Sequence, residues 1–571
     1  MFEQKMSKTF VRLLDLKETL TEILAGSIDR AREDGTLPLN RRPAIQLDIP
    51  KDSLLGDFAS NLAMVLARDL KRSPREIAKV VIDHLSDPDG LIARCEVAGP
   101  GFINFFLKED YWVKVLKDIE AKGDAYGRSE LGKGSRVIVE FVSANPTGPL
   151  HIGHGRGAVV GDALCRILNA SGYEVSREFY INDAGRQLKD LGRSVWLRYR
   201  QLFDGSVPFP SEGVYPGEYV MDIARQVRDR EGDRFLSMAE ADAVSALSDS
   251  GCRMMLDAIR SDLKKMGVRF DLFFSEKSLY EQGKVQACIS ELKEKHLVFE
   301  EENGALVLRT SLFGDDKDRV LIKGNGEYTY FASDIAYHRD KLGRGADRLI
   351  NIWGADHHGY IPRIKSVVRA LGHDADTLQV LLIQMVNLLR EGKPVRMGKR
   401  SGEFVTLSEV IEEVGTDAAR FFFLLRRSDS HLDFDLDLAK TQSNENPVYY
   451  VQYAHARICS IFRQAGDKGI PIPESGDVNF DLLSLPEEKD LMRFLGAYPE
   501  VVEGAALALE PHRIPFYLQE LAARLHAYYF KQRIISEEQE KNSARLFLVG
   551  AVRTVIRNAL NLLGVSAPEK M

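Results

Sequence analysis

The chain has 571 residues, of which 44% are hydrophobic, with a formal net charge of −7 and a pI near 6.0. This length predicts about three or four domains, and the acidic balance argues mildly against a nucleic-acid partner without excluding one, because binding depends on where Lys and Arg cluster. The five cysteines lie far apart with no CxxC pair, which argues against a cysteine zinc site and favours reduced thiols in the cytoplasm, and no apolar run approaches a membrane span.

The N-terminal region mixes helical and strand patterns. Apolar residues at helical spacing predict a helix within residues 1–35, and a strand is expected at 44–49. Residues 56–63 are expected to open a helix and residues 100–106 to form a closing strand. A helix N-cap and an edge strand would explain the last two segments without any binding role. Glycine-rich sequence then marks a boundary, so we expect an α+β domain at residues 1–125.

Residues 137–181 predict one βαβ unit. The apolar, β-branched run at 137–142 is typical of a buried parallel strand, and a loop rich in proline and glycine follows it. Apolar residues then recur at helical spacing as far as Gly172, which is placed to end the helix, and residues 173–181 are expected to form a second strand. Such units hold phosphate at the start of the helix.

The start of that helix carries two histidines and two glycines. His151 and His154 are three residues apart, so they share a helix face, and both can donate hydrogen bonds to phosphate oxygens beside the free amides of the first turn. Gly153 and Gly155 lack a Cβ, so a base or ribose could lie against the backbone. The alternative is that these residues only cap an ordinary core helix. The agreement of strand, loop, histidines and glycines favours a nucleotide site.

The chain then continues into a second half of the same predicted fold. Residues 182–187 are expected to start a basic helix, whose charges are more often a solvated face than an RNA contact, and residues 204–280 a largely helical insertion. The second half begins at residues 326–334, with buried strands expected at 348–353 and 378–385.

Three acidic residues are predicted at strand ends or turns of one crevice. They are Glu140, Asp334 and Asp356, and Tyr330 adds a ring face or hydroxyl four residues before Asp334. An apolar substrate would leave these carboxylates unpaired, whereas a planar cation could donate forked hydrogen bonds to them. The sequence therefore favours a cationic substrate.

The turn after the strand at 348–353 allows two interpretations. Asp356, His357 and His358 could be metal ligands, or they could form part of a cleft wall. We favour the cleft wall, because a metal site usually needs a further ligand nearby.

Helical patterns dominate from residue 407 onward, after an expected nucleotide-binding domain at 126–444. Residues 445–571 are expected to form an all-α domain, with helices at 447–461, 485–509, 512–531 and 542–564. In its first helix, Tyr449, Tyr453 and Arg457 suit base stacking, but they are equally ordinary core aromatics with a nearby cation.

Class I aminoacyl-tRNA synthetases share a signature that resembles His151-Ile152-Gly153-His154. The arginyl-tRNA synthetase branch is similar in the preceding segment Glu140-Phe141-Val142-Ser143-Ala144-Asn145-Pro146-Thr147-Gly148-Pro149-Leu150. Residues 396–402 resemble the second signature, with Lys399 in place of its second lysine. Arg396 replaces the first lysine and Gly398 the first serine. A near copy of this signature at residues 5–9 precedes the histidines, so we interpret it as chance.

This resemblance implies an α/β, Rossmann-like catalytic domain between an α+β domain that touches the tRNA elbow and an all-α anticodon-binding bundle. It implies that ATP activates arginine, which is then joined to the 2′-hydroxyl of the terminal adenosine of arginine tRNA. It also implies that tRNA is needed for activation. Mg²⁺ would arrive with ATP, with no metal ligand from the protein. We expect a cytoplasmic monomer without a membrane partner.

The resemblance also assigns roles to individual residues. The expected catalytic residues are His151, His154 and Lys399. The expected ATP-binding residues are His151, Gly153, His154, Gly155, Gly354, Met397 and Lys399. The expected arginine-binding residues are Glu140, Ser143, Asn145, Tyr330, Asp334 and Asp356, with Asn145 and Ser143 at the amino and carboxylate ends of the substrate. The expected tRNA-binding residues are Asn61, Tyr449, Tyr453 and Arg457.

Two alternatives remain open at this point. One is an enzyme of the same superfamily with another substrate, such as a different class I synthetase or a nucleotidylyltransferase; the C-terminal helices argue against the latter. The other is a non-catalytic tRNA-binding module, which the presence of His151, His154, Asn145 and Lys399 argues against. Pyrophosphate exchange with a panel of amino acids separates all of these.

Overall fold

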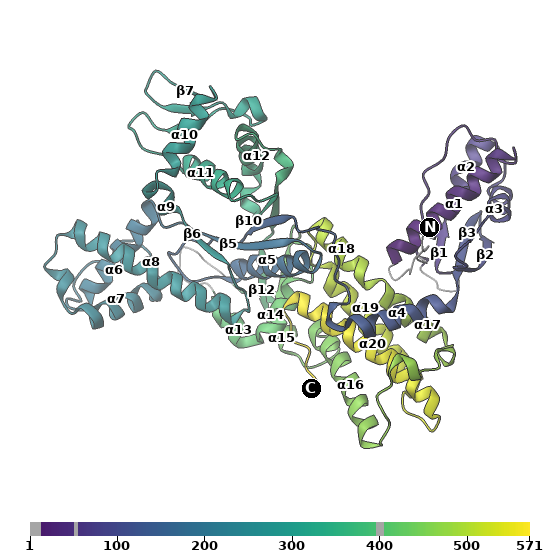
Figure 1. The fold of residues 1–571 in the computed structure, drawn as a ribbon. Helices are drawn as coiled ribbons and strands as arrows, with labels where there is room; N and C mark the ends of the chain where they lie inside the picture. The colour runs from purple at the N-terminus through teal and green to yellow at the C-terminus, as the bar shows by residue number, and fades with distance from the viewer. Residues whose placement is uncertain (1–12, 51–54, 396–404) are drawn as a thin grey trace, which may run out of the picture.

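A five-stranded parallel sheet lies at the centre of the computed structural model, which describes residues 13–50, 55–395 and 405–571 (Figure 1). Its strands, in spatial order, are β11 (Leu378–Ile383), β10 (Arg348–Gly354), β4 (Arg136–Glu140), β5 (Glu174–Ile181) and β6 (Leu272–Ser275). The chain runs from β4 outward to β6 and returns on the other side of β4 to form β10 and β11. The strand order therefore switches direction between β4 and β10, and ligands of such sheets bind beyond the carboxyl ends of the strands at this point.

Helices cover both faces of the sheet. α5 (Ile152–Ala170) packs on one face, while α11 (Tyr330–Gly343) and α12 (Ile361–Ala370) lie on the other (Figure 1). The alternation of side chains along β4 explains this, because Val137 and Val139 belong to the core under α5, whereas Ile138 belongs to the core under α11 and α12. The predicted βαβ unit and the strands expected at 348–353 and 378–385 are confirmed.

The segment after β5 forms a helical projection with its own core. α6 (Arg186–Gln201), α7 (Glu218–Glu231) and α8 (Glu240–Lys265) pack together beside the sheet (Figure 1). The expectation of a helical insertion over residues 204–280 was wrong at its C-terminal end, since β6 pairs with β5 inside the central sheet. The aromatic run of β6 fits a strand buried between helices.

The N-terminal region is an α+β unit. Its three-stranded antiparallel sheet has the order β1 (Phe58–Ser60), β3 (Phe102–Leu107) and β2 (Ile92–Ala98). Its helices are α1 (Leu13–Glu33), α2 (Leu62–Leu70) and α3 (Pro74–Asp83). The strand expected at 100–106 is confirmed, but it occupies the centre of the sheet rather than an edge. The strand expected at 44–49 is wrong, because only Asp48 forms a bridge, to Ala59, and residues 58–60 are a strand before the expected helix.

Smaller elements surround the catalytic sheet. Between β6 and α11 lie α9 (Glu276–Glu281), α10 (Lys284–Glu294) and an antiparallel sheet of β7 (Val298–Glu300), β8 (Leu306–Leu308) and β9 (Arg319–Ile322). After β11, β12 (Val386–Arg390) pairs with β13 (Lys393–Pro394) and with β14 (Leu432–Asp435). The helices α13 (Leu407–Val414), α14 (Thr416–Phe423) and α15 (Leu436–Lys440) complete this region.

The C-terminal helices form an all-α bundle, as expected. They are α16 (Pro447–Asp467), α17 (Pro486–Gly496), α18 (Tyr498–Ala508), α19 (Arg513–Lys531) and α20 (Gln539–Leu563). α4 (Glu109–Lys122) leads from the N-terminal unit and packs on α17 and α20 (Figure 1). In the described part of the chain, α20 alone is long and apolar enough to cross a membrane, but 67% of its apolar window is buried, as in a core helix of the bundle.

Candidate active site

The start of α5 is a histidine capping box. His151 occupies the N-cap position, and its Nδ1 accepts a hydrogen bond from the backbone N of Gly153 at 3.1 Å. His154 Nδ1 accepts from the backbone N of His151 at 3.3 Å, and the two rings stack with centroids 3.7 Å apart. Both histidines therefore satisfy amides that a helix start would otherwise leave unpaired.

This cap also fixes the tautomer of both rings. Because each Nδ1 accepts from a backbone N–H, the neutral form of each imidazole carries its proton on Nε2. The atoms that can donate to a phosphate oxygen are thus the Nε2 atoms. The capping interpretation and the phosphate interpretation are compatible, since they use different nitrogens of the same rings.

Gly153 and Gly155 of α5 have packing roles of their own, and their expected contact with a nucleotide stays a prediction. A Cβ at Gly155 would lie 2.5 Å from Cδ1 of Leu407 in α13, and one at Gly153 would lie 3.0 Å from Cε1 of His151. Gly155 is therefore needed for the close approach of α5 to α13. Gly153 makes room for the imidazole that caps the helix.

Glu140 ends β4 and is buried in the switch-point crevice. Its Oε2 accepts from Nζ of Lys341 at 2.5 Å, and its Oε1 accepts from Oγ of Ser143 at 3.1 Å. Lys341 is itself fully buried and also donates to Oδ1 of Asn351 at 3.0 Å. The expectation of three unpaired acids at the crevice was therefore wrong for Glu140, because Lys341 neutralises it.

Asp334 lies close to Glu140 on α11. Burial, together with repulsion from Glu140, raises the pKa of Asp334 to about 6, although a hydrogen bond from Tyr360 opposes the shift. A nearby cation would stabilise the ionised form of this buried carboxyl. Asp334 is therefore the strongest candidate for the partner of a guanidinium.

Tyr330 and Asp356 are both exposed, but only Tyr330 approaches the loop that follows β5. A Cβ at Gly185 would lie 3.4 Å from Oη of Tyr330, so the tyrosine hydroxyl reaches the loop after β5. Asp356, whose side chain is 82% exposed, lies beyond β10 and pairs with His357 at 3.6 Å. Its Oδ1 lies over Gly354, where a Cβ would be 2.5 Å away. The structure brings Glu140 and Asp334 together but leaves Asp356 on the surface.

Glu276 is a buried acid of this crevice that sequence patterns missed. It follows β6 as the first residue of α9, and burial raises its pKa to about 7, with Asp334 adding repulsion. Hydrogen bonds with Ser333 and Tyr180 oppose the shift. The signal in the sequence was the apolar run of β6, which ends at this glutamate; assigning the run to a helical insertion hid it.

Two non-glycine residues after β4 adopt left-handed backbone conformations. Val142 has φ +69° and Ser143 has φ +41°. A β-branched residue in this region is strained by roughly 1–3 kcal/mol, and such strain clusters at binding sites. The turn points Oγ of Ser143 toward Glu140 and toward the backbone N of Tyr180, which donates to it at 3.2 Å.

Asn145 joins the two loops at the carboxyl ends of β4 and β5. Its Nδ2 donates to Oε1 of Gln187 at 2.7 Å, and its Oδ1 accepts from Nδ2 of Asn182. The helical projection also reaches this loop, because Oη of Tyr219 in α7 donates to the backbone O of Thr147 at 2.7 Å. The signature loop is thus fixed from two sides.

The second signature-like segment, with Met397 and Lys399, lies outside the described residues. Its downstream flank is described: Thr406 forms an antiparallel bridge with His151, and the backbone N of Leu407 donates to O of Leu150 at 2.8 Å. The near copy of the signature at residues 5–9 also lies outside the described residues.

An aromatic array lies between α16 and α19 in the bundle. The rings of Tyr449 and Tyr453 stack with centroids 5.9 Å apart, and Tyr453 stacks on His526 at the same distance. The guanidinium of Arg457 lies 4.8 Å from the ring of Tyr453 and 4.6 Å from that of Tyr529. The predicted residues Tyr449, Tyr453 and Arg457 are therefore in contact, and His526 and Tyr529 extend the array.

Asn61 occupies the N-cap position of α2, but its side chain makes no capping hydrogen bond. The plain N-cap explanation therefore does not account for this asparagine. Val65, one turn later on the same helix, is 51% exposed. This end of α2 therefore presents an amide next to an exposed apolar side chain.

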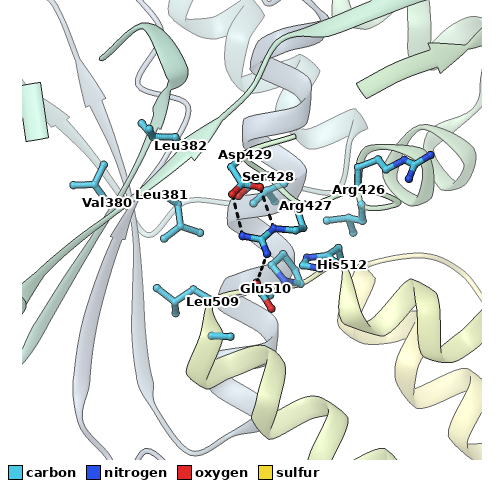
Figure 2. Close-up of a pocket in the computed structure, with 14 residues that line it drawn as sticks. Val380, Leu381, Leu382, Arg426, Arg427, Ser428, Asp429, Leu509, Glu510 and His512 are labelled. Atoms are coloured by element: carbon cyan, nitrogen blue, oxygen red, sulfur yellow. Dashed lines mark hydrogen bonds and ion pairs between the residues drawn. The ribbon is translucent and has the colours of Figure 1, made fainter. Parts of the chain in front are cut away.

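A cavity of about 270 Å³ lies away from the crevice, between the catalytic sheet and the bundle (Figure 2). It is lined by Leu381 of β11, by the loop at 426–429 and by the turn at 508–512. Arg427 pairs there with Asp429 and Glu510. Among the described residues, its lining includes none of the predicted site residues.

Three family descriptions together match most of the chain. "Arginyl tRNA synthetase N terminal domain" matches residues 15–107, "tRNA synthetases class I (R), catalytic domain" matches 116–423, and "DALR anticodon binding domain" matches 451–571.

Similar proteins give the same result along the full length. The arginine–tRNA ligase of Citrifermentans bemidjiense is 53% identical over 557 residues, which cover 97% of this chain and 100% of the relative. That of Bacillus subtilis is 46% identical, with 97% and 99% covered. The solved arginyl-tRNA synthetase of Thermus thermophilus has a TM-score of 0.73 at 25% identity, with 97% of this chain and 100% of that chain covered. This chain therefore belongs to the arginyl-tRNA synthetase family.

Proposed function

We propose that the chain activates L-arginine with ATP and transfers it to the 2′-hydroxyl of the terminal adenosine of arginine tRNA. In the first step a carboxylate oxygen of arginine bonds to the α-phosphorus, and the bond to the bridging oxygen of the β-phosphate breaks, so pyrophosphate leaves. In the second step the 2′-oxygen attacks the activated carbonyl, and AMP leaves. Neither step needs a nucleophile from the protein, so catalysis is positioning and neutralisation of charge.

The buried acids that follow the central strands, together with the capped start of the helix that follows β4, carry this proposal. Asp334 and Glu276 are buried carboxyls with raised pKa values that an incoming guanidinium would stabilise in their charged form. Glu140 is committed to Lys341, so we assign it the role of holding Ser143 rather than neutralising the substrate. Tyr330 at the start of α11, whose hydroxyl approaches the loop after β5, and Asn145 in the loop after β4 are proposed to contact the substrate.

The phosphates of ATP would lie at the start of α5. The Nε2–H groups of His151 and His154 and the first-turn amides are donors suited to the α-phosphate, and Lys399 would neutralise the leaving phosphates. Gly354 at the end of β10 and Met397 are proposed to contact the nucleotide. No group of three or more potential ligands in the described residues could hold a metal, so Mg²⁺ would be held by the phosphates.

The tRNA would contact both ends of the chain. Unstacked bases of the anticodon loop would lie against the rings of Tyr449 and Tyr453 and the guanidinium of Arg457. The side chain of Asn61, which makes no capping hydrogen bond, is proposed to contact the tRNA elbow. In this proposal the domains are residues 1–125, 126–444 and 445–571, and the enzyme acts as a cytoplasmic monomer.

The direct test is aminoacylation of total tRNA with each of the twenty amino acids, paired with pyrophosphate exchange in the presence of tRNA. We expect product with arginine only, and ATP consumption that depends on both arginine and tRNA. Product with another amino acid, or none with arginine, would refute the proposed substrate.

A further inference from the structure

Arg156 is a fully buried arginine on α5, two residues after His154. Its Nη1 donates to the backbone O of Gln384 at 2.9 Å and of Ser430 at 2.8 Å, and its Nη2 donates to the backbone O of Arg427 at 2.7 Å. Burial lowers its pKa only to about 10, so the group is charged at neutral pH. The charge of Asp429 opposes this shift, but all three hydrogen bonds go to backbone carbonyls. Burying a cation to bind carbonyls is costly, which indicates a geometric role.

The carbonyls that Arg156 holds belong to two segments that also bond to each other. The backbone N of Gln384 donates to O of Ser428 at 2.8 Å, and β12 pairs with β14 directly after these contacts. Gln384 joins β11 to β12, which leads through β13 to the sequence just before the segment that carries Lys399. Arg156 therefore attaches the base of this hairpin to the catalytic helix.

The residues that follow the same segment pair with the chain at the N-cap of α5. Thr406 bridges to His151, and Leu407 donates to Leu150. Arg156 therefore holds Gln384 at the base of the hairpin that precedes this segment, and backbone pairing at His151 holds the residues that follow it. At 100° per residue, Arg156 projects to the side of α5 opposite His154, so it holds the hairpin without entering the crevice.

The loop held by Arg156 is also fixed from the bundle. The side chain of Arg427 pairs with Asp429 at 3.0 Å and with Glu510, just beyond α18, at 3.6 Å, on the cavity side of the loop (Figure 2). The carbonyl of Arg427 points the other way, to Arg156. One short loop therefore connects the catalytic helix to the bundle.

We propose that Arg156 is a positioning residue for arginine activation. It holds Gln384, at the base of the β12–β13 hairpin, and the 427–430 loop in a fixed relation to α5, whose start carries His151 and His154. The inference rests on the proposed roles of these two histidines. A fixed relation matters most when charge develops on the phosphates, so its loss should lower turnover more than substrate binding.

The test compares Arg156→Lys with Arg420→Lys in the full-length protein. Arg420 is equally buried and also donates to backbone carbonyls, those of Leu563 and Met266. It differs in pairing with Asp162, in the middle of α5 and away from the histidines. Arginine-dependent pyrophosphate exchange with tRNA gives kcat and the KM values for arginine and ATP, and thermal unfolding gives stability. We expect Arg156→Lys to lower kcat at least tenfold, about 1.4 kcal/mol, with KM values within about threefold.

The control separates positioning from general destabilisation. Arg420→Lys should lower the melting temperature while leaving kcat within about twofold of wild type. If Arg156→Lys does not fold, Arg156→Met supplies the same test without a buried charge. The inference is overturned if the folded Arg156 variant keeps wild-type kcat, or if both positions lose kcat equally. A wild-type chain without arginine-dependent exchange would instead refute the proposed function, before any variant is compared.

Discussion

The ammonium group of Lys341 lies 2.5 Å from Oε2 of Glu140, and both side chains are buried at the switch point of the sheet. This ion pair determines which acids of the crevice are available to a cationic substrate. Glu140 has its cation within the fold, and its other oxygen, Oε1, accepts a hydrogen bond from Ser143. Asp334 accepts a hydrogen bond from Tyr360 but forms no ion pair with any described residue, and its pKa is raised. A guanidinium entering the crevice would therefore gain most from Asp334.

Breaking this ion pair should be costly. Lys341→Met leaves a buried carboxylate without its cation, and we expect a loss of about 3–5 kcal/mol in the free energy of unfolding. Adding Glu140→Gln should restore most of that loss, because the uncompensated charge is removed. Denaturant unfolding measures both. The control is Lys365→Met, which breaks the more exposed pair with Asp376 and should cost under about 1 kcal/mol.

The two tasks of His151 can be separated by substitution. Asparagine is a good N-cap, so His151→Asn should keep the helix start, whereas His151→Ala should lose about 0.5–2 kcal/mol of stability. Both variants lack the imidazole Nε2–H and should lose activation rate, with arginine affinity little changed. Pyrophosphate exchange and thermal unfolding give the two readouts. Full activity in His151→Asn would mean that capping is the only role of this histidine.

Arginine binding should weaken in acid. The pKa of Asp334 is about 6, above the usual value near 3.9, so the folded state holds its proton more tightly than the unfolded chain. The stability that protonated Asp334 contributes is complete below about pH 4 and is lost as the pH rises through 6. A guanidinium needs the ionised form, so affinity should fall as the pH drops through 6, and binding near pH 6 should release protons.

Calorimetry in buffers of different ionisation enthalpy measures this proton release. Asp334→Asn should remove most of it, and Glu276→Gln should remove the part nearer pH 7, where burial places the pKa of Glu276. The exposed Asp376→Asn serves as the control and should behave as wild type. Unchanged proton release in Asp334→Asn would contradict the role given to this residue.

Relieving the strained turn after β4 should raise the stability of the protein and weaken arginine binding. Val142→Gly removes a β-branched side chain from a backbone with φ +69°, and we expect a gain of about 1 kcal/mol in stability. The freer backbone should hold Ser143 less precisely, so the KM for arginine should rise. Lys71→Gly, at φ +51° beyond α2, is the matched control and should change stability without changing KM. Steady-state kinetics that do not change in Val142→Gly would show that the strain has no function.

The aromatic array should contribute to tRNA affinity. Base stacking on an aromatic residue contributes about 1–3 kcal/mol, so Tyr453→Ala should weaken tRNA binding by roughly 5- to 150-fold. Filter binding with arginine tRNA measures this. Phe516→Ala removes another exposed aromatic from α19, outside the array, and should bind tRNA as wild type does. Equal losses in both variants would indicate a general effect on the bundle.

Local sequence patterns were sufficient for the elements that depend on neighbouring residues. The βαβ unit around α5, the strands β10 and β11 and most helices of the bundle follow from apolar periodicity, which reports only which face of a segment is buried. The single helix expected at 485–509 is two helices, α17 and α18. The same signals failed where burial comes from distant elements. Residues 44–49 alternate like a strand yet form a single bridge, and the short aromatic β6 was assigned to a helical insertion.

Sequence alone determined the family, the fold class and the histidine helix start, because these depend on contiguous residues with a fixed order. Tertiary structure decided which acids are available to a cation. Lys341 is 201 positions from Glu140 in the chain, and no local pattern reveals that it neutralises that carboxylate. The tertiary structure also revealed that Glu276 is buried in the crevice and that Arg156 binds backbone carbonyls. Both features depend on strands and loops that meet only when the sheet forms. Charge balance in a buried crevice is a property of the folded chain, because desolvation and pairing act through space.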